Sequence, residues 1–295
     1  MHNPFPQKIC FLIHLLYICG IRKYWKRKNL TMSKNDFQTA INLIRSGETD
    51  RGLELLEKAT APETIKNIAK AEIAYYRDDL KNAMYFDEHS LPADHQWYDP
   101  LIVNHHLRAY VYAAKKTGSI SRAIEFLDYY IAQKRKEYGF AAAKPFENIY
   151  LNAMRRLNGQ KTTDAPKKIK IITPAECQST IIFENNGCTR EESARMISSM
   201  LMYMWNNIET EKVLKIYEEY ADLITLDDHH IWAARNYIKL HDDVNALTCL
   251  MRYVKGWTPT EKFTVMPMKV FVFNDILKYW TPEIRRQFLV LNKNR

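Results

Sequence analysis

Apolar residues recur at helical spacing along most of the chain. In residues 36–59 they fall three or four positions apart in two stretches, which a break around Gly47 separates. A period near 3.6 residues places such positions on one face of a helix. We therefore expect two helices, and the short turn between them makes them an antiparallel pair.

The second helix of this expected pair carries a motif that returns farther along the chain. Gly52 is small, and a large residue, Leu56, follows four positions later. A small residue lets the helix approach its partner closely, and the large residue fills the space toward the next pair. Further copies have their key residues at Ala83, at Ala123, Leu127 and Tyr130, at Val213, Tyr217 and Tyr220, and at Ala246, Leu250 and Tyr253. We expect a first helix before each copy, over 63–77, 100–116, 190–206 and 228–240.

These copies resemble the tetratricopeptide repeat (TPR). Residues 47–59 are similar to the family pattern G-x-x-x-x-A-x-x-x-F-x-x-A, and residues 231–237 are similar to the aromatic, small and tyrosine positions of its first helix. The copies at Val213 and Ala246 are 33 residues apart, close to the family's period, whereas copies in the first half lie 31 and 40 apart. The resemblance covers about 34–137 and 190–256. It implies an all-α, TPR-like superhelix, which is a solenoid of antiparallel helix pairs with an irregular linker in mid-chain.

The helical rhythm stops over 159–187, and this break sets the expected domain organisation. Residues 164–174 begin as a polar linker and then alternate like a short strand. Capping boxes at Thr189 and Thr258 mark the starts of later helices, and Pro282 opens a last helix that would cover the final pair. The expected division is an N-terminal extension over 1–31, helical repeats over 32–159, a linker over 160–188, and repeats with a capping helix over 189–295.

The net charge of +9 is concentrated at one end of the chain. Residues 1–31 hold six Lys and Arg and no Asp or Glu, which leaves 37 basic and 34 acidic groups elsewhere. The apolar run over 9–21 is shorter than the roughly 20 residues of a membrane span. Met32 has the surroundings of a natural start, so we expect 1–31 to be a disordered or untranslated extension. A membrane anchor over 9–28 and a packed helix are the alternatives.

Cysteine usage and charge together bear on location and partners. The five cysteines are scattered and form no C-x-x-C pair, which indicates reduced thiols and a cytoplasmic protein. Tyr24 and Trp25 interleave the basic tract, and such a tract can bind nucleic acid. Because the rest of the chain is nearly balanced in charge, we expect no nucleic-acid partner.

Motifs of cofactor-dependent catalysis are absent from the sequence. It has no P-loop, no G-x-G-x-x-G and no G-x-S-x-G, and only eight glycines from which to build one. We therefore expect no enzymatic activity and no cofactor. Adjacent histidines point about 100° apart on a helix, so such a pair does not chelate a metal alone. The metal candidates are the His and Asp residues from Asp227 to Asp243, and a second group at His89, Asp94, His95, His105 and His106.

A stripe of basic, aromatic and methionine side chains recurs on the expected first helices. In TPR proteins this helix lines the concave groove, so the resemblance implies a binding face there. Arg and aromatic residues form interface hot spots, and Met adapts to irregular partners. The candidate partner-binding residues are His105, Arg108, Tyr112, Lys115, Arg195, Met202, Trp205, Trp232, Arg235 and Lys239.

These candidates predict a non-catalytic protein that binds another protein through its groove. It would be an adaptor, a regulator, or an immunity protein that neutralises a bacterial toxin domain, and its basic stripe residues favour an acidic partner. Charge reversal at Arg108 and Arg235 is expected to weaken partner capture and to leave helicity intact. The alternatives are a metal-dependent hydrolase that uses the Asp227–Asp243 cluster, and a nucleic-acid or membrane binder that uses the basic N-terminal tract.

Overall fold

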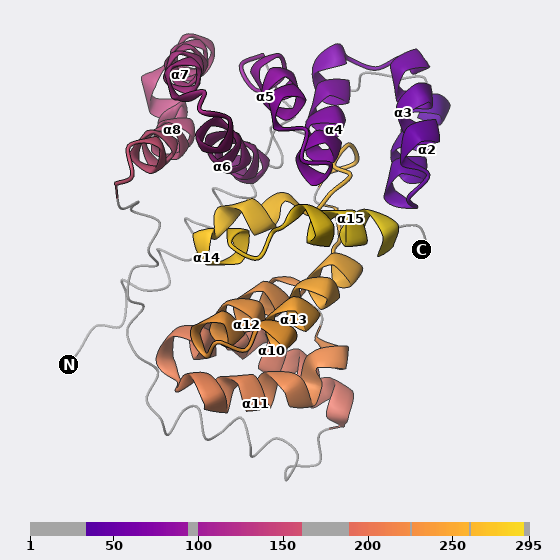
Figure 1. The fold of residues 1–295 in the computed structure, drawn as a ribbon, viewed down its shortest axis with the longest axis vertical. Coiled ribbons are helices and arrows are strands. Elements are labelled where there is room, and N and C mark those ends of the chain that lie inside the picture. The colour runs from indigo at the N-terminus through magenta and orange to yellow at the C-terminus, as the bar shows by residue number, and fades with distance from the viewer. Residues whose placement is uncertain (1–33, 94–99, 161–188, 225, 260, 292–295) are drawn as a thin grey trace, which may run out of the picture.

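The computed structural model describes residues 34–93, 100–160, 189–224, 226–259 and 261–291. Within these ranges every regular element is a helix, as the all-α expectation requires (Figure 1). The expected extension over 1–31 and the short strand of the linker lie outside them. The α-helices are α2 (Lys34–Arg45), α3 (Thr49–Lys58), α4 (Glu63–Tyr76), α5 (Leu80–Glu88), α6 (Pro100–Thr117), α7 (Ile120–Ala142), α8 (Lys144–Leu157), α10 (Arg190–Asn207), α11 (Thr210–Tyr220), α12 (Asp228–Lys239), α13 (Asp243–Gly256), α14 (Asn274–Leu277) and α15 (Pro282–Leu291); the 3-10 helices are η3 (Ala221–Leu223) and η4 (Met268–Val272).

The helices form two blocks with a third part between them. Helices α2–α8 make the N-terminal block and α10–α13 make the C-terminal block. The described residues of 257–291, here called the C-terminal segment, lie between the two blocks in Figure 1. Helix η4 contacts α6, α14 contacts α12, and α15 contacts both α4 and α13. The segment therefore joins helices from both blocks.

Sequential helices pack as antiparallel pairs, as the motif copies predict. A Cβ atom on Gly52 would lie 2.6 Å from the Ile44 side chain and 2.9 Å from the Ala40 carbonyl oxygen, so only glycine allows this approach of α3 to α2. The small residues Ala83, Ala123 and Ala246 of the other copies are all buried. The close approach that the sequence predicts is thus present between α2 and α3, and the small residues of these other pairs are buried.

Four of the pairs share one kind of turn, in which a single residue has a positive φ. Gly47 (φ 87°), Asp78 (63°), Gly118 (71°) and His241 (60°) occupy this position after the first helix of their pairs. In the Asp78 and His241 turns the next residue is an aspartate whose carboxylate accepts the N–H three positions later. This is N-capping, and it satisfies one of the free donors at the start of the second helix. These four helix pairs therefore share one turn geometry.

The C-terminal segment contributes large side chains to the core. Trp280 is fully buried, stands edge-on to Tyr76 at 5.3 Å between ring centroids, and stacks on Phe288 at 4.7 Å. Phe271 lies 5.4 Å from Tyr75 of α4. The helix expected to open at Pro282 is present as α15. It contacts α13 of the last pair and α4 of the N-terminal block.

The helix expected after the Thr258 capping box is not found in the described residues. Glu261–Pro267 form a loop, here called the 261–267 loop, before the 3-10 helix η4. Backbone groups that a helix would pair internally are bonded to side chains of α2 and α4 instead. Arg45 binds the carbonyl oxygen of Thr264, and Glu72 binds the N–H groups of Val265 and Met266. Tertiary contacts override the local signal here.

Candidate functional site

Four candidate residues of the predicted groove contact the chain's own C-terminal segment. From α6, Arg108 donates from Nη1 to the Val272 carbonyl oxygen at 2.8 Å, and the Tyr112 and Phe271 ring centroids are 5.8 Å apart. From α12, Trp232 lies 5.6 Å from Phe273, and Arg235 donates from Nε to Asp275 at 2.7 Å. These four side chains therefore contact residues 271–275 of the same chain.

The remaining candidates differ in exposure. Trp205 is buried and donates from Nε1 to His229 at 3.3 Å. His105 is half-buried on α6. Lys115, Arg195, Met202 and Lys239 are exposed, and Lys239 also bonds Asn236. Only these last candidates lie openly on the surface.

Replacing Arg235 with alanine is expected to lower the free energy of unfolding by about 1–2 kcal/mol. The guanidinium bonds Asp275 and lies over the rings of Trp232 and Phe273, at 4.8 and 4.3 Å. Urea denaturation followed by circular dichroism measures the change. Arg195→Ala, on an exposed stripe position, is the matched control and should stay within about 0.5 kcal/mol. Equal losses in the two variants would contradict the assignment of Arg235 to the C-terminal segment.

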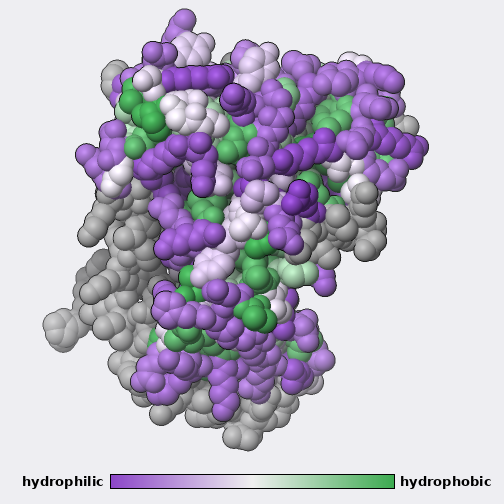
Figure 2. All heavy atoms as spheres, in the orientation of Figure 1, coloured by the Kyte–Doolittle hydropathy of each residue, from purple (hydrophilic) through white to green (hydrophobic). Residues whose placement is uncertain are grey.

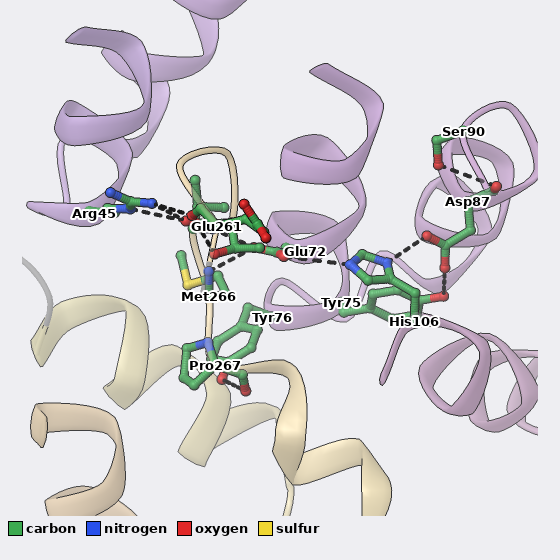
Figure 3. Close-up of polar contacts among 12 residues, drawn as sticks. Arg45, Glu72, Tyr75, Tyr76, Asp87, Ser90, His106, Glu261, Met266 and Pro267 are labelled. Atoms are coloured by element: carbon green, nitrogen blue, oxygen red, sulfur yellow. Dashed lines mark hydrogen bonds and ion pairs between the residues drawn. The ribbon is translucent and has the colours of Figure 1, made fainter. Parts of the chain in front are cut away.

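The 261–267 loop is bound from one side by α2 and α4. Arg45 donates to the carbonyl oxygens of Glu261, Lys262 and Thr264 at 2.8–3.1 Å, and Tyr76 donates to the Pro267 carbonyl oxygen at 2.7 Å. Figure 3 shows these side chains around the loop. A planar guanidinium with five donors suits several carbonyl groups at once. The loop conformation is thus set by contacts across the fold.

A chain of buried charged groups runs from this loop into the N-terminal block (Figure 3). Glu72 Oε2 accepts the N–H of Val265 at 2.5 Å and that of Met266 at 2.8 Å, while Oε1 lies 3.5 Å from His106 Nε2. His106 Nδ1 contacts Asp87 at 2.7 Å. Burial opposes the charge on the imidazole, but Asp87 and Glu72 outweigh it and raise the pKa of His106 to about 10. Burial also raises the pKa of Asp87, against the opposing effect of His106. His106 therefore carries its proton between two buried acidic side chains.

A cavity of about 330 Å³ opens beside this chain of charges. Glu72, His105 and His106 line it from the N-terminal block, and Met202 and residues 226–228 line it from the C-terminal block. Tyr253 of α13, together with residues 257–258 and 264–269, completes the wall. Both blocks and the C-terminal segment thus meet at the cavity. It is the candidate functional site.

The charged groups of the cavity have distinct environments. Asp228 forms an ion pair with Lys269. Burial and the neighbouring Asp228 raise the pKa of Asp227. Burial, with the positive charges of Lys269 and His106 nearby, lowers the pKa of His105 to about 3. The wall therefore combines three acidic side chains, one lysine and two histidines whose pKa values are shifted in opposite directions.

Large apolar side chains stand where the cavity meets solvent. Leu101, Met202 and Leu226 line the cavity and are nevertheless 47%, 42% and 49% exposed. They come from α6, from α10 and from the connection before α12. Met202 is one of the candidates from the sequence. Leu101 and Leu226 have no sequence signal, because each lies beside the start of a helix and outside its apolar periodicity.

The metal candidates from the sequence separate in space. His229 Nε2 lies 2.6 Å from the Ser198 carbonyl oxygen, and His230 Nδ1 lies 2.7 Å from the Tyr217 hydroxyl, both inside the C-terminal block. His241 belongs to a turn and Asp227 to the cavity. No group of three or more His, Cys, Asp and Glu side chains within the described ranges could hold a metal ion. Asp94 and His95 of the second group lie outside those ranges.

Comparisons of the chain with protein-family models, with curated protein sequences and with solved structures give no match. Among the helices in the described part of the chain, none is long and apolar enough to cross a membrane.

Proposed function

We propose that this chain is a non-catalytic helical-repeat protein that binds a partner protein over the cavity between its two blocks. One observation carries the proposal: Leu101, Met202 and Leu226, from three separate elements, are exposed around the opening of a cavity with charged walls. Exposed apolar side chains that gather in one place, with polar groups beside them, are typical of a protein-binding surface.

The surface around the cavity opening at Leu101, Met202 and Leu226, here called the cavity face, is a better binding surface than the first-helix groove. Residues 271–275 already occupy the side chains of Arg108 and Arg235. A partner that took their place would have to expose Phe271, which is fully buried in the core. Burying a phenylalanine contributes about 1.5–3 kcal/mol, so such an exchange is costly. A partner at the cavity face would not have to displace residues 271–275.

The exposed face of α10 extends this surface away from the cavity. Met196 and Tyr203 are exposed, as are Arg195 and Met202 of the sequence candidates. Positions three, four and seven apart share one face of a helix. Methionine adapts to irregular contacts and tyrosine often anchors them. A partner docked at the cavity would therefore contact α10 as well.

In the proposed mode of action, a preformed surface of this chain covers a segment of the partner. The helix pairs are proposed to be TPR-like repeats, which the shared positive-φ turn and the close approach at Gly52 support. An adaptor, a regulator and a toxin-neutralising immunity protein remain versions of this function. The acidic partner that the stripe residues predict is less favoured, because Arg108 and Arg235 bond within the chain.

The test compares partner capture by two variants of the full chain. The double variant Met202→Glu with Leu226→Glu places charge at the cavity opening, and we expect it to retain the partner at least tenfold less than the wild type. Val244→Glu is the matched control, because Val244 is 75% exposed on α13 and does not line the cavity. Quantitative mass spectrometry of captured proteins from the native host identifies the partner, and titration with the purified partner measures its affinity. Equal retention by both variants would refute the proposal.

A further inference from the structure

We infer that the cavity accepts a tyrosine side chain of the docked partner. The aromatic ring lies along the apolar wall, and the hydroxyl lies at the buried end, where it accepts a hydrogen bond from His106 and donates one to Glu72. This inference rests on the proposed function for the source of the side chain. The preference of the cavity for a phenol is tested below without any partner.

An unused hydrogen-bond donor at the buried end of the cavity carries the first step. His106 is fully buried, and its Nε2 edge faces the cavity, because Glu72 on that side lines the cavity and Asp87 on the Nδ1 side does not. Since the pKa of His106 is raised to about 10, its ring carries a proton on each nitrogen at pH 7. The Nε2–H has no acceptor of suitable geometry among the described residues. Buried donors normally have partners, so this one needs an acceptor.

A neighbouring acceptor narrows the kind of group that fits. Glu72 Oε1 lies 3.5 Å from His106 Nε2, whereas Glu72 Oε2 already accepts the N–H groups of Val265 and Met266. A group that accepts from Nε2 and donates to Oε1 therefore matches both atoms. A hydroxyl does so with a single oxygen, because it has one donor and two acceptor lone pairs.

The charges of the wall favour an uncharged group. Lys269 pairs with Asp228, and the carboxylate of Asp227 accepts two backbone N–H groups. Arg45 adds a positive charge near Glu72. Every carboxylate of the wall thus has a cation or a donor beside it, and an entering carboxylate would meet the like charge of Glu72. A phenol keeps its proton up to about pH 10 and brings no charge.

The apolar wall and the size of the cavity fit an aromatic ring. Met266, Met268 and Trp257 line the cavity. Methionine sulfur and aromatic rings both make favourable contacts with a ring, and tyrosine combines an apolar body with a polar tip. Serine and threonine carry the hydroxyl without a ring. Ligand pockets span about 300 to 1,000 Å³, and this one, at about 330 Å³, suits a single side chain.

The exposed apolar residues at the opening assign the phenol to a protein. Leu101 and Leu226 stand where the cavity meets solvent, and a free phenol inside the cavity would leave them uncovered. A docked protein covers them with the residues that flank its tyrosine. Tyrosine is also enriched among the anchor residues of protein interfaces.

The test titrates the full chain with blocked amino acids in ligand-observed NMR. The main probes are the N-acetyl, N-methylamide forms of tyrosine and phenylalanine, which differ only in the hydroxyl. We expect the tyrosine probe to bind with millimolar affinity. The phenylalanine probe should bind at least tenfold more weakly, because it leaves the buried N–H of His106 without an acceptor. Lysine, glutamate and glutamine probes represent the other chemistries and should also bind at least tenfold more weakly than tyrosine.

The variant His106→Leu removes the donor, and we expect it to bind the tyrosine and phenylalanine probes equally. His89→Leu is the matched control, because His89 is exposed and does not line the cavity, and it should keep the preference for tyrosine. Thermal unfolding checks that each variant remains folded. If His106→Leu does not fold, the Nε2–H resonance of His106 in the wild type decides. The tyrosine probe should move this proton downfield, as a new hydrogen bond does, and the phenylalanine probe should not.

Four outcomes would count against the inference or the proposed function. No binding of the tyrosine probe, equal binding of tyrosine and phenylalanine, as when a water molecule serves His106, or a preference that persists in His106→Leu would overturn the inference. Tighter binding of the lysine, glutamate or glutamine probe would overturn the choice of a phenol. Binding of free 4-methylphenol at least a hundredfold tighter than the tyrosine probe would overturn the assignment to a protein side chain. Selective tyrosine binding together with unchanged partner capture in the Met202→Glu, Leu226→Glu variant would overturn the proposed function and leave the cavity chemistry standing.

Discussion

Replacing Glu72 with alanine is expected to lower the free energy of unfolding by about 3–5 kcal/mol. The carboxylate is buried, it accepts two backbone N–H groups of the 261–267 loop, and it faces the imidazolium of His106. The change leaves two buried donors without an acceptor, and each such group costs about 1–3 kcal/mol. Urea denaturation at pH 7, followed by circular dichroism, gives the difference in unfolding free energy.

The matched control lies on the same helix. Glu63 of α4 is exposed and pairs with Lys66 and Lys70, so Glu63→Ala should cost less than about 1 kcal/mol. Glu72→Gln keeps one acceptor oxygen and should fall between the two alanine variants. If Glu72→Ala cost no more than Glu63→Ala, the buried carboxylate would not hold the loop.

Stability is expected to fall as the pH rises above about 6.5, because His106 keeps its proton in the folded state. An unfolded histidine loses its proton near pH 6.5, and the pKa of His106 in the folded protein is about 10. Burial opposes this shift, and Asp87 and Glu72 produce it. A group with a raised pKa contributes its full stability below the unfolded pKa and loses it as the pH rises through the folded pKa. The loss is at most about 1.4 kcal/mol per pH unit.

Unfolding free energies between pH 6.5 and 8.5 isolate this contribution. Above that window the Cys249 thiol also contributes to the loss of stability with rising pH, because burial raises its pKa to about 12. His105 and His230 act on the acid side, since burial lowers their pKa values to about 3 and 4, and their contribution is lost as the pH falls below about 6.5. His106→Gln should abolish the alkaline slope, whereas His89→Gln, at an exposed position, should keep it. A slope that persists in His106→Gln would assign it to other groups.

Local features of this fold could be predicted because their causes are local. The periodic apolar positions predict first helices within one or two residues of α4, α6, α10 and α12. Gly52 indicates the close approach of α3 to α2, because only glycine leaves room for it. The capping box at Thr189 forms with Glu192 as expected. Each of these signals is contained within a few neighbouring residues.

The cavity and the C-terminal segment could not be predicted in this way. Glu72 and Val265 are 193 residues apart, and nothing in either sequence neighbourhood points to the other. Arg108 and Arg235 fit the pattern of partner-binding residues. A helix face that binds a partner and a helix face that packs against the chain's own C-terminal segment carry the same residue types, so the sequence does not distinguish them. One signal was available for Glu72: it falls on the apolar face of α4, between Ile68 and Ile73, where a buried charge needs a partner.

The contacts of the C-terminal segment have a consequence for synthesis on the ribosome. Tyr76 and Glu72 leave the ribosome long before Trp280 and Val265, which complete their surroundings. Because synthesis adds about 5–20 residues per second, part of the apolar surface of the N-terminal block stays uncovered for roughly 10–40 seconds. Chaperones that bind exposed apolar chain would act in this interval, and a nascent chain halted before Trp257 would remain their substrate.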